Sequence, residues 1–379
     1  MAARIVLFGA TGYTGRLVAE AMVERGMKPV LAARSQEKLD ALAGELGDGL
    51  ETAVADVSDP PSVSALVERG DVLVTTVGPF ARWGAPAAAA ATTAGAHYLD
   101  STGEPAFIRE VFERYGPAAE RSGAGMLTAF GYDWVPGNLA GALALRRAGD
   151  EAVRVDVGYF ITGRASPSGG TQATMAASLG KPSFAFRDGR VRTERTAQRV
   201  RSFQVGSKRR EGVSVGSSEH FTLPRIAPQL REVNAYLGWF GPFSRPMQAF
   251  SFGASLPGAS HLLKLAAERF VKGSSGGPDA EARKRSGSHI MAIAYDGAGR
   301  ELAEVHVAGV DGYTFTGRIL AWGAQLAAEG GLQGTGALGP ADGFGLVALT
   351  DGCRWAGLEE EGGARQPAAG SEPDRAAVE

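Results

Sequence analysis

The stretch IVLFGATGYTGRLVAEAM, residues 5 to 22, places four apolar residues directly before three glycines that recur at every third position. The apolar run predicts a buried strand, and residues 16–25 carry the pattern of a helix. Gly9 allows a sharp turn, Gly12 allows the backbone to approach a pyrophosphate, and Gly15 allows the helix to pack against the strand. Free N–H groups at the helix start then bind the phosphate charge. The alternative is an ordinary strand-to-helix turn without a ligand.

The predicted phosphate-binding residues in this loop are Gly9, Thr11, Gly12, Tyr13, Thr14 and Gly15. Folds that bind NAD usually present Asp or Glu at the end of the second strand, where a carboxylate accepts from the ribose 2'-hydroxyl. This chain has Arg34 and Ser35 there. Because a guanidinium pairs with a 2'-phosphate, the expected cofactor is NADPH. Lys38 either assists or is a solvated helix residue, and Asp56 is either an adenine contact or a turn residue.

Short apolar runs alternate with helical patterns up to about residue 130, which predicts an α/β fold with a Rossmann doubly wound parallel sheet. Strands are expected at 5–8, 29–33, 51–55, 72–77, 97–100 and 126–130, and helices at 16–25, 36–46, 61–69, 85–94 and 107–122. Residues 1–137 should form this NADP-binding domain, completed by a helix that returns within residues 340–358.

Beyond Gly137 the pattern changes to a second α+β domain, residues 138–339, with a mostly antiparallel sheet. Its expected strands are 153–162, 212–215, 232–237, 288–295 and 301–308, and its expected helices are 171–179, 259–271 and 313–328. Asp188-Gly189 marks a hairpin within residues 184–192. Residues 273–287 are expected to be a mobile loop and residues 359–379 a disordered tail.

The composition excludes several classes of function. The 379 residues include 39 basic and 41 acidic side chains, a formal net charge of -2 that offers no broad field for nucleic acid or an anionic membrane. Cys353 is the only cysteine, so the chain has no intramolecular disulfide and no zinc site built from several cysteines; no metal is predicted. The start of the sequence lacks a secretory signal, and no apolar stretch reaches the roughly 18 residues of a spanning helix. A cytoplasmic protein is expected.

Several motifs occur in a family-specific order: GATGYTG, LAARS, TTVGPF (75–80), HYLDSTGE (97–104), GYDWVPGNLAG (131–141) and SGGTQATM (168–175). In this series the chain resembles the saccharopine dehydrogenase-like oxidoreductases, notably the branch with trans-acting enoyl reductases. The resemblance covers about residues 4–180, and two later motifs extend it to about 325. It departs from the usual pattern at GYDW, where a serine commonly follows the aspartate.

The resemblance implies an NADPH-dependent reductase of an activated C=C or C=N bond in a biosynthetic intermediate, with the nicotinamide near Val77, Gly78, Pro79 and Phe80. A Gly-Pro turn at the carboxyl end of the fourth strand agrees with this placement. The alternative for that turn is a rigid connection without a ligand contact. The alternative for the protein is a non-catalytic NADP-binding sensor or scaffold.

Hydride transfer leaves negative charge on the acceptor, which a nearby donor must stabilise or protonate. The candidate catalytic residues are Tyr132, Asp133 and Tyr98, which follow or lie on two neighbouring strands. Tyr132 is the leading donor because a phenol stays neutral at pH 7 and can donate; packing at a domain junction is the alternative. Asp100 and Glu104 are expected to cap a turn or a helix start.

The substrate is expected to be a small molecule or a carrier-bound one. Ser168, Gly169, Gly170 and Thr171 precede a predicted helix whose N–H groups would receive an anionic substrate group, with capping as the alternative for Ser168. Nine basic residues between 187 and 210 suggest either a solvated hairpin face or a dock for an acidic carrier protein. Residues 246–270 are read as core, substrate channel or lipid-associated surface. A homodimer is expected.

Overall fold

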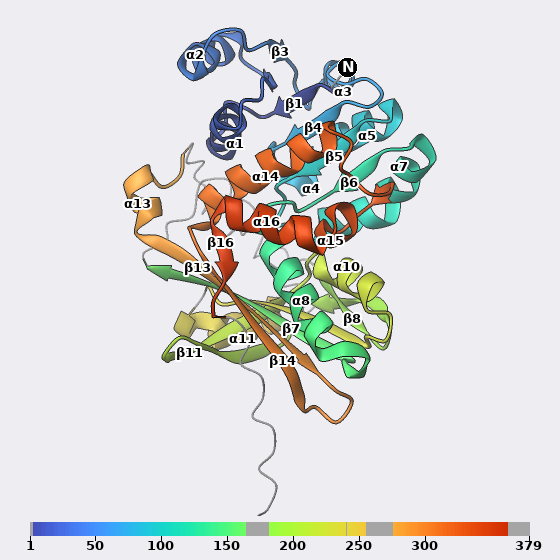
Figure 1. The fold of residues 1–379 in the computed structure, drawn as a ribbon, viewed down its shortest axis with the longest axis vertical. Helices are drawn as coiled ribbons and strands as arrows, with labels where there is room; N and C mark the ends of the chain where they lie inside the picture. The colour runs from blue at the N-terminus through green and yellow to red at the C-terminus, as the bar shows by residue number, and fades with distance from the viewer. Residues whose placement is uncertain (1–2, 164–181, 240, 255–275, 363–379) are drawn as a thin grey trace, which may run out of the picture.

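The computed structural model describes residues 3–163, 182–239, 241–254 and 276–362, which form two lobes, each built on one sheet (Figure 1). The upper lobe in Figure 1 holds the N-terminal elements, and the chain returns to it at its C-terminal end. The predicted helices at 171–179 and 259–271 lie outside the described residues.

The first sheet has seven parallel strands in the order β15-β6-β5-β4-β1-β2-β3. Its strands are β1 (Ile5–Phe8), β2 (Val30–Ala33), β3 (Thr52–Val54), β4 (Val72–Thr75), β5 (His97–Asp100), β6 (Gly125–Leu127) and β15 (Gly336–Ala337). The strand order reverses beside β1, which is where doubly wound sheets bind their ligands. The predicted Rossmann sheet is confirmed, with strand ends within three residues of expectation.

Helices cover both faces of this sheet, which explains why its strands read as continuous apolar runs (Figure 1). All four residues of β4 are buried, and α1 turns Val18, Ala19 and Met22 into the core. These helices are α1 (Tyr13–Glu24), α2 (Gln36–Leu46), α3 (Pro60–Ser64), α4 (Phe80–Trp83), α5 (Ala85–Ala94), α6 (Pro105–Glu110) and α7 (Gly116–Ser122), with a π-helical turn at Val111–Tyr115 between the last two.

The second sheet has nine strands, and the pairing of β12 with β7 is its one parallel pair among the described residues. The order is β10-β11-β12-β7-β13-β14-β16, with β8 paired to β12 and β9. Its strands are β7 (Arg154–Gly163), β8 (Pro182–Arg187), β9 (Arg190–Arg195), β10 (Val200–Val205), β11 (Lys208–Val215), β12 (Glu232–Leu237), β13 (Ser286–Tyr295), β14 (Glu301–Gly309) and β16 (Leu358–Glu360). The mostly antiparallel second sheet is therefore confirmed.

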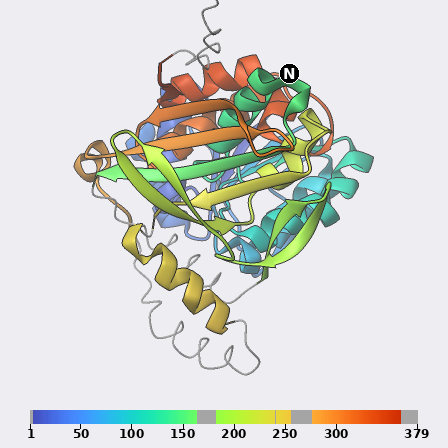
Figure 2. The same ribbon diagram turned by 90° about the horizontal axis from the view of Figure 1, so that it is seen from below.

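One face of the second sheet packs against α8 (Val135–Ala148), whose first eleven residues are all buried. Seen from below, the strands lie in front of the helices of the upper lobe (Figure 2). A separate cluster packs on the other face and comprises Phe160, Phe203, Val205, Tyr236, Met291, Ile293 and Tyr295. The remaining helices are α10 (Glu219–Ile226), α11 (Ser244–Ala254) and α13 (Ala280–Lys284), with 3-10 turns at Gly149–Glu151 and Gly241–Phe243.

The five strands expected at 153–162, 212–215, 232–237, 288–295 and 301–308 form as β7, β11, β12, β13 and β14, and the expected hairpin forms as well. The hairpin forms around Asp188 and Gly189, both with positive φ. Strand β10 and helix α10 were not predicted. The prediction of a mobile loop at 273–287 is wrong from residue 280 onward, because α13 and the start of β13 lie there. The expected tail begins too early, because Glu359 and Glu360 pair with β14.

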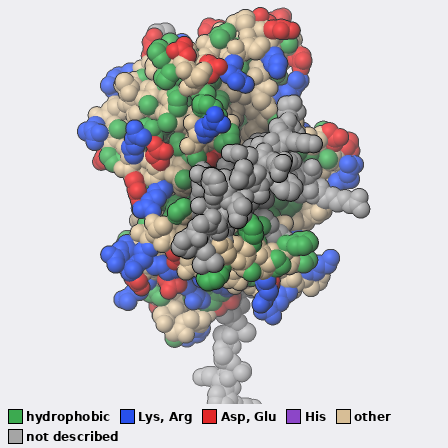
Figure 3. Space-filling model, turned by 180° about the vertical axis from the view of Figure 1, so that it is seen from behind, with side chains coloured by type: hydrophobic (Ala, Val, Ile, Leu, Met, Phe, Trp, Pro, Cys, Tyr) green, Lys and Arg blue, Asp and Glu red, His purple; other side chains and the backbone are tan. Residues whose placement is uncertain are grey.

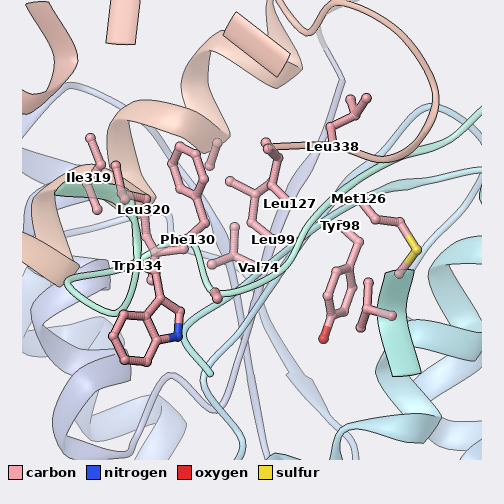
Figure 4. Close-up of a cluster of buried hydrophobic side chains, with 14 of the residues drawn as sticks. Val74, Tyr98, Leu99, Met126, Leu127, Phe130, Trp134, Ile319, Leu320 and Leu338 are labelled. Atoms are coloured by element: carbon pink, nitrogen blue, oxygen red, sulfur yellow. The ribbon is translucent and has the colours of Figure 1, made fainter. Parts of the chain in front are cut away.

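The chain returns to the first sheet before residue 340, the boundary expected from sequence. Helix α14 (Gly312–Ala328) packs on α1 so closely that a Cβ at Gly317 would lie 2.9 Å from the Leu17 carbonyl oxygen. Strand β15 then joins the sheet, followed by α15 (Pro340–Phe344) and α16 (Leu346–Ala356). Figure 4 shows Ile319 and Leu320 of α14 beside core residues of the sheet. We therefore propose that the Rossmann unit also includes residues 312–339.

Candidate cofactor and active site

The glycine loop makes a tight turn at the end of β1. Gly9 has φ +92°, and its N–H donates to the Ala32 carbonyl oxygen at 2.8 Å. At Gly15 a Cβ would lie 2.1 Å from the Gly9 carbonyl oxygen, so only glycine fits there. Gly12 has a different environment, because the nearest atom to its hypothetical Cβ is that same oxygen at 3.3 Å. The predicted reasons for Gly9 and Gly15 agree with this geometry.

The start of α1 presents open N–H groups. Gly12 is its N-cap, no side chain caps the helix, and its first turn has no acidic residue. Thr11 and Gly12 are exposed, and Tyr13 and Thr14 are half-buried. An uncapped helix start that reaches the surface beside a glycine turn suits an anionic ligand such as a pyrophosphate.

Tyr13 has partners that the sequence did not predict. Its hydroxyl donates to the Pro278 carbonyl oxygen at 2.5 Å and accepts from Arg283 Nη1 at 3.1 Å. Its ring meets the edge of Tyr313 on α14. The side chain of Tyr13 thus anchors the segment 276–285 of the second lobe against the glycine loop, and its main chain remains at the helix start. Arg283 had no sequence signal, because it is one arginine among many on a polar stretch.

Arg34 and Asp56 lie near each other past the ends of β2 and β3. Arg34 is exposed, and no ion pair to it is found in the described part of the chain. Asp56 accepts from the N–H and the hydroxyl of Ser58, each at 2.8 Å. These bonds, with a smaller contribution from Arg34, lower the pKa of Asp56. Ser35 caps α2 by accepting from the Lys38 N–H at 3.4 Å, so Asp56 and Ser35 both serve local turns.

The turn at residues 77–80 lies directly beside the glycine loop. A Cβ at Gly9 would approach Val77 Cγ2 to 2.9 Å, and the Thr76 hydroxyl donates to the Gly9 carbonyl oxygen at 3.2 Å. Gly78 is exposed, and Val77 and Pro79 are half-buried. Phe80 is buried against Phe107. The structure therefore brings the predicted nicotinamide turn and the predicted phosphate loop together at one edge of the sheet.

Glu104 and Asp100 have structural partners. The buried Glu104 carboxylate accepts from the backbone N–H groups of Phe80 at 2.6 Å and Ala81 at 3.0 Å, which fixes the start of α4. Asp100 accepts from the Thr102 N–H, the Ala129 N–H and the Thr128 hydroxyl, each at 2.8 Å. Burial raises the pKa of Asp100 to about 6 in spite of these donors. Asp100 caps its own turn, as expected from the sequence, whereas Glu104 caps the start of α4 and makes no side-chain cap to its own helix.

Tyr98 is an unsuitable catalytic candidate. Its side chain is fully buried on β5 within the main hydrophobic cluster, and burial raises its pKa well above the ordinary value. Figure 4 shows Tyr98 among the core residues between the sheet and its covering helices. Tyr98 lies within strand β5 in the middle of the hydrophobic cluster, whereas Tyr132 and Asp133 lie in the loop that follows β6.

The loop from Tyr132 to Trp134 carries buried polar atoms without partners. These atoms are Tyr132 Oη, Asp133 Oδ1 and Trp134 Nε1. The Tyr132 N–H donates to Thr316 Oγ1 at 3.0 Å, which holds the loop against α14. Burial raises the pKa of Tyr132 and raises the pKa of Asp133 to about 7. Unpaired polar atoms are rare in protein interiors, so this loop is a candidate part of the site.

Asp133 faces the other predicted loop. A Cβ at Gly103 would lie 2.6 Å from Asp133 Oδ2, so the glycine of the STGE motif leaves room for this carboxyl. The structure thus places Asp133 where the loop after β6 contacts the loop after β5. Ser168 to Thr171 and Arg164 lie outside the described residues.

Four of the nine basic residues between 187 and 210 form ion pairs with acidic residues of the chain. Arg187 lies 3.3 Å from Glu194, Arg192 lies 2.7 Å from Asp188, and Arg199 lies 2.6 Å from Glu194. Arg201 pairs with Asp156. On the face drawn in Figure 3, Lys and Arg side chains form separate groups interspersed with acidic ones. The interpretation of residues 187–210 as a solvated hairpin face therefore has more support than a binding surface for an acidic carrier protein.

A family model, the saccharopine dehydrogenase NADP binding domain, matches residues 5–126. Residues 5–126 are therefore similar in sequence to this domain family. The resemblance inferred from the sequence motifs is confirmed.

Two curated relatives are named trans-acting enoyl reductase. The one from Mycobacterium leprae (strain TN) is 40% identical over 140 residues, which cover 36% of this chain and 34% of the relative. The one from Mycobacterium ulcerans (strain Agy99) is 37% identical over 152 residues, which cover 39% of this chain and 36% of the relative. The match thus spans about a third of the length of each relative.

Among solved structures, apo histidine-tagged saccharopine dehydrogenase (L-Glu forming) from Saccharomyces cerevisiae matches with a TM-score of 0.59 and 12% identity. The match covers 95% of this chain and 99% of that one, so both lobes share the fold. None of the helices in the described ranges is both long and apolar enough to cross a membrane.

Proposed function

We propose that this protein is an NADPH-dependent reductase that acts on an activated C=C bond, with a C=N bond as the second candidate substrate group. The observation that carries the proposal is the uncapped start of α1 behind the glycine turn, with the exposed Arg34 at the end of β2. The names of the relatives favour the C=C bond, and the family model supports a nicotinamide cofactor.

The residues present fit NADPH. The α1 N–H groups of Tyr13 and Thr14 suit its pyrophosphate, and Gly12 leaves the backbone open to it. Arg34 would pair with the 2'-phosphate, and residues 77–79 would lie beside the nicotinamide. When bound, NADPH supplies a hydride to the substrate. The chain itself must then hold the substrate, exclude water and deliver a proton, for which Tyr132 and Asp133 are the candidates.

Substitution of Arg34 tests the cofactor assignment. We expect Arg34→Ala to weaken NADPH binding by about tenfold or more, because it removes a charge-assisted pair with the 2'-phosphate. Binding of NADH should change little. Calorimetric titration with both cofactors measures the effect, and Arg190→Ala, an exposed arginine on β9, is the matched control. Equal affinity of the wild type for both cofactors would contradict the proposal.

The substrate group is tested by turnover. Oxidation of NADPH is followed by absorbance with enoyl thioesters, free or on a carrier protein, and with cyclic imines. We expect activity with an enoyl thioester. Tyr132→Phe and Asp133→Asn should each lower kcat by about 100-fold if that residue is the proton donor. A carrier-bound substrate and a homodimer remain predictions.

A further inference from the structure

Asp133 and Glu219 are two carboxyls, one half-buried and one fully buried, that lie in no ion pair within the described ranges. Glu219, in the first turn of α10, is fully buried, and its Oε2 has no hydrogen-bond partner. Asp133 is half-buried, and its Oδ1 has none. An ionised carboxylate in such surroundings is costly, so a group of this kind retains its proton to higher pH.

Tyr159 on β7 connects Glu219 to the loop that carries Asp133. Its hydroxyl lies 2.6 Å from Glu219 Oε1 and 3.1 Å from the Trp134 carbonyl oxygen, and it accepts from the Gly137 N–H at 2.8 Å. A Cβ at Gly137 would lie 2.0 Å from that hydroxyl and 2.4 Å from Glu219 Oε1. The glycine in the GYDWVPG stretch therefore makes room for this contact, and the contact holds the main chain on the C-terminal side of Asp133.

The two carboxyls also interact electrostatically. Burial, with a smaller contribution from the charge of Asp133, raises the pKa of Glu219 to about 7. The other titratable groups around them are Tyr159, Tyr132 in the same loop, and Asp311 at the start of α14, which adds negative charge near Tyr132. His220 is next to Glu219, but burial lowers its pKa to about 3, so it supplies no positive charge at pH 7. Like charges without a counter-ion share protons as a pair.

We propose that Asp133 and Glu219 form an acid pair that holds an exchangeable proton at neutral pH and delivers it to the substrate through Asp133. The delivery of this proton to a substrate rests on the reductase function proposed above. Hydride addition to the β-carbon of an enoyl thioester leaves an enolate. The pair gives one proton to the α-carbon, gains one negative charge, and takes a proton back from water before the next turnover. We assign the contact with the substrate to Asp133 because this residue keeps some exposed surface. Glu219 is fully buried, so it is a positioning residue that acts through Asp133.

Infrared titration of the full chain without cofactor tests the pair by following the carbonyl band of protonated carboxyl groups. In the wild type we expect carboxyl signal that is lost near pH 7. Asp133→Asn should remove part of it. In Glu219→Gln the remaining Asp133 signal should be lost about one pH unit lower, because a like charge is gone. Glu360→Gln, in an accessible pair with Arg147, is the matched control and should leave the titration unchanged.

Tyr159→Phe provides a second variant in case Glu219→Gln does not fold, as judged by circular dichroism. It removes a donor to the Glu219 carboxylate, so the carboxyl signal should persist to higher pH. Loss of all carboxyl signal below pH 5 in the wild type would overturn the pair, as would titrations of Glu219→Gln and Tyr159→Phe that match the wild type.

The proposed function can fail separately from the pair. If NADPH does not bind, the reductase assignment fails and the infrared result still stands. If the carboxyls titrate at ordinary pH while NADPH binds and is oxidised, the pair fails and the reductase remains. In turnover assays, kcat of Glu219→Gln should begin to fall about one pH unit lower than kcat of the wild type on the high-pH side of the pH profile. The KM for NADPH should change by less than about twofold.

Discussion

At the residue scale, the buried carboxyls of the site region differ in the donors around them, and this difference assigns their roles. Asp100 accepts three hydrogen bonds and Glu104 accepts two from backbone N–H groups, so both are satisfied as loop anchors. Asp133 and Glu219 each keep an oxygen without a partner. A buried carboxyl whose oxygens accept hydrogen bonds stabilises the fold. A buried carboxyl with an unpaired oxygen lowers stability, so its presence suggests a functional role.

The glycine at position 15 offers a prediction at this scale. A Cβ there would lie 2.1 Å from the Gly9 carbonyl oxygen, a backbone atom that cannot move aside. We expect Gly15→Ala to lower the free energy of unfolding by roughly 1–3 kcal/mol and to weaken NADPH binding, because the loop must shift. Urea denaturation measures the first effect, and calorimetry measures the second.

Gly44→Ala is the matched control for Gly15. Gly44 is an exposed residue of α2, and nothing lies within 4 Å of its hypothetical Cβ. Alanine there should raise the free energy of unfolding by about 0.4–1 kcal/mol, because it reduces the freedom of the unfolded chain. If the two variants lose equal stability, the close approach of α1 to β1 is not the reason for Gly15.

At the element scale, the segment 276–285 ties the second lobe to the glycine loop. Helix α13 has polar, exposed or half-buried residues and no buried apolar face. Its connection to α1 depends on Tyr13, Pro278 and Arg283. An element held by a few polar contacts opens more easily than one held by apolar burial.

Tyr13→Phe tests this connection. The variant loses the hydroxyl that donates to the Pro278 carbonyl oxygen and accepts from Arg283. We expect a loss of about 1 kcal/mol in stability and faster amide exchange in α13. NADPH affinity should stay the same, because the N–H of residue 13 remains at the start of α1. Lys284→Ala, which removes only an exposed pair with Glu281, should leave exchange unchanged. A large loss of NADPH affinity in Tyr13→Phe would instead place the phenol at the cofactor.

The elements also show which parts of the fold the sequence could predict. The strands of the first sheet are buried on both faces, so their apolar runs are visible locally, and the Asp188-Gly189 turn fixes its hairpin by local conformation. Strand β10 reads VRSFQV, in which apolar and polar residues do not alternate regularly, and its pairing with β11 depends on tertiary context. The sequence analysis did not single out Glu219, because one acidic residue in a polar stretch forms no motif that would mark it as a site residue. Only the fold brings it to Tyr159.

At the whole-molecule scale, the second sheet and the Rossmann unit meet around α8 and the loop before it. Helix α8 packs against β7, β13 and β14, and α15 and α16 of the Rossmann unit pack on α8. Carboxyls at this junction are buried from both sides, which neither lobe achieves alone. The burial of Asp133 and Glu219 is therefore a property of the assembled fold, and their ionisation is linked to its stability.

This linkage predicts an unusual pH dependence of stability. The pKa of Glu219 rises from an ordinary 4.5 to about 7, so between these values the folded state binds a proton that the unfolded state has released. The contribution of this proton to the free energy of unfolding is therefore largest below about pH 4.5. It decreases as the pH rises toward 7, by up to about 1.4 kcal/mol per pH unit. Asp133 contributes in the same direction, from 3.8 to about 7.

Comparison of the wild type with Glu219→Gln isolates this contribution. The pKa of His220 is lowered to about 3, so that residue gives the opposite slope up to about pH 6.5, but it does so in both proteins and cancels in the difference. Chemical denaturation at several pH values from 5 to 8 should show a wild type that loses stability relative to Glu219→Gln as the pH rises. A difference that stays constant over this range would mean that Glu219 is ionised throughout, and the junction would then hold a buried carboxylate at a cost the described residues do not offset.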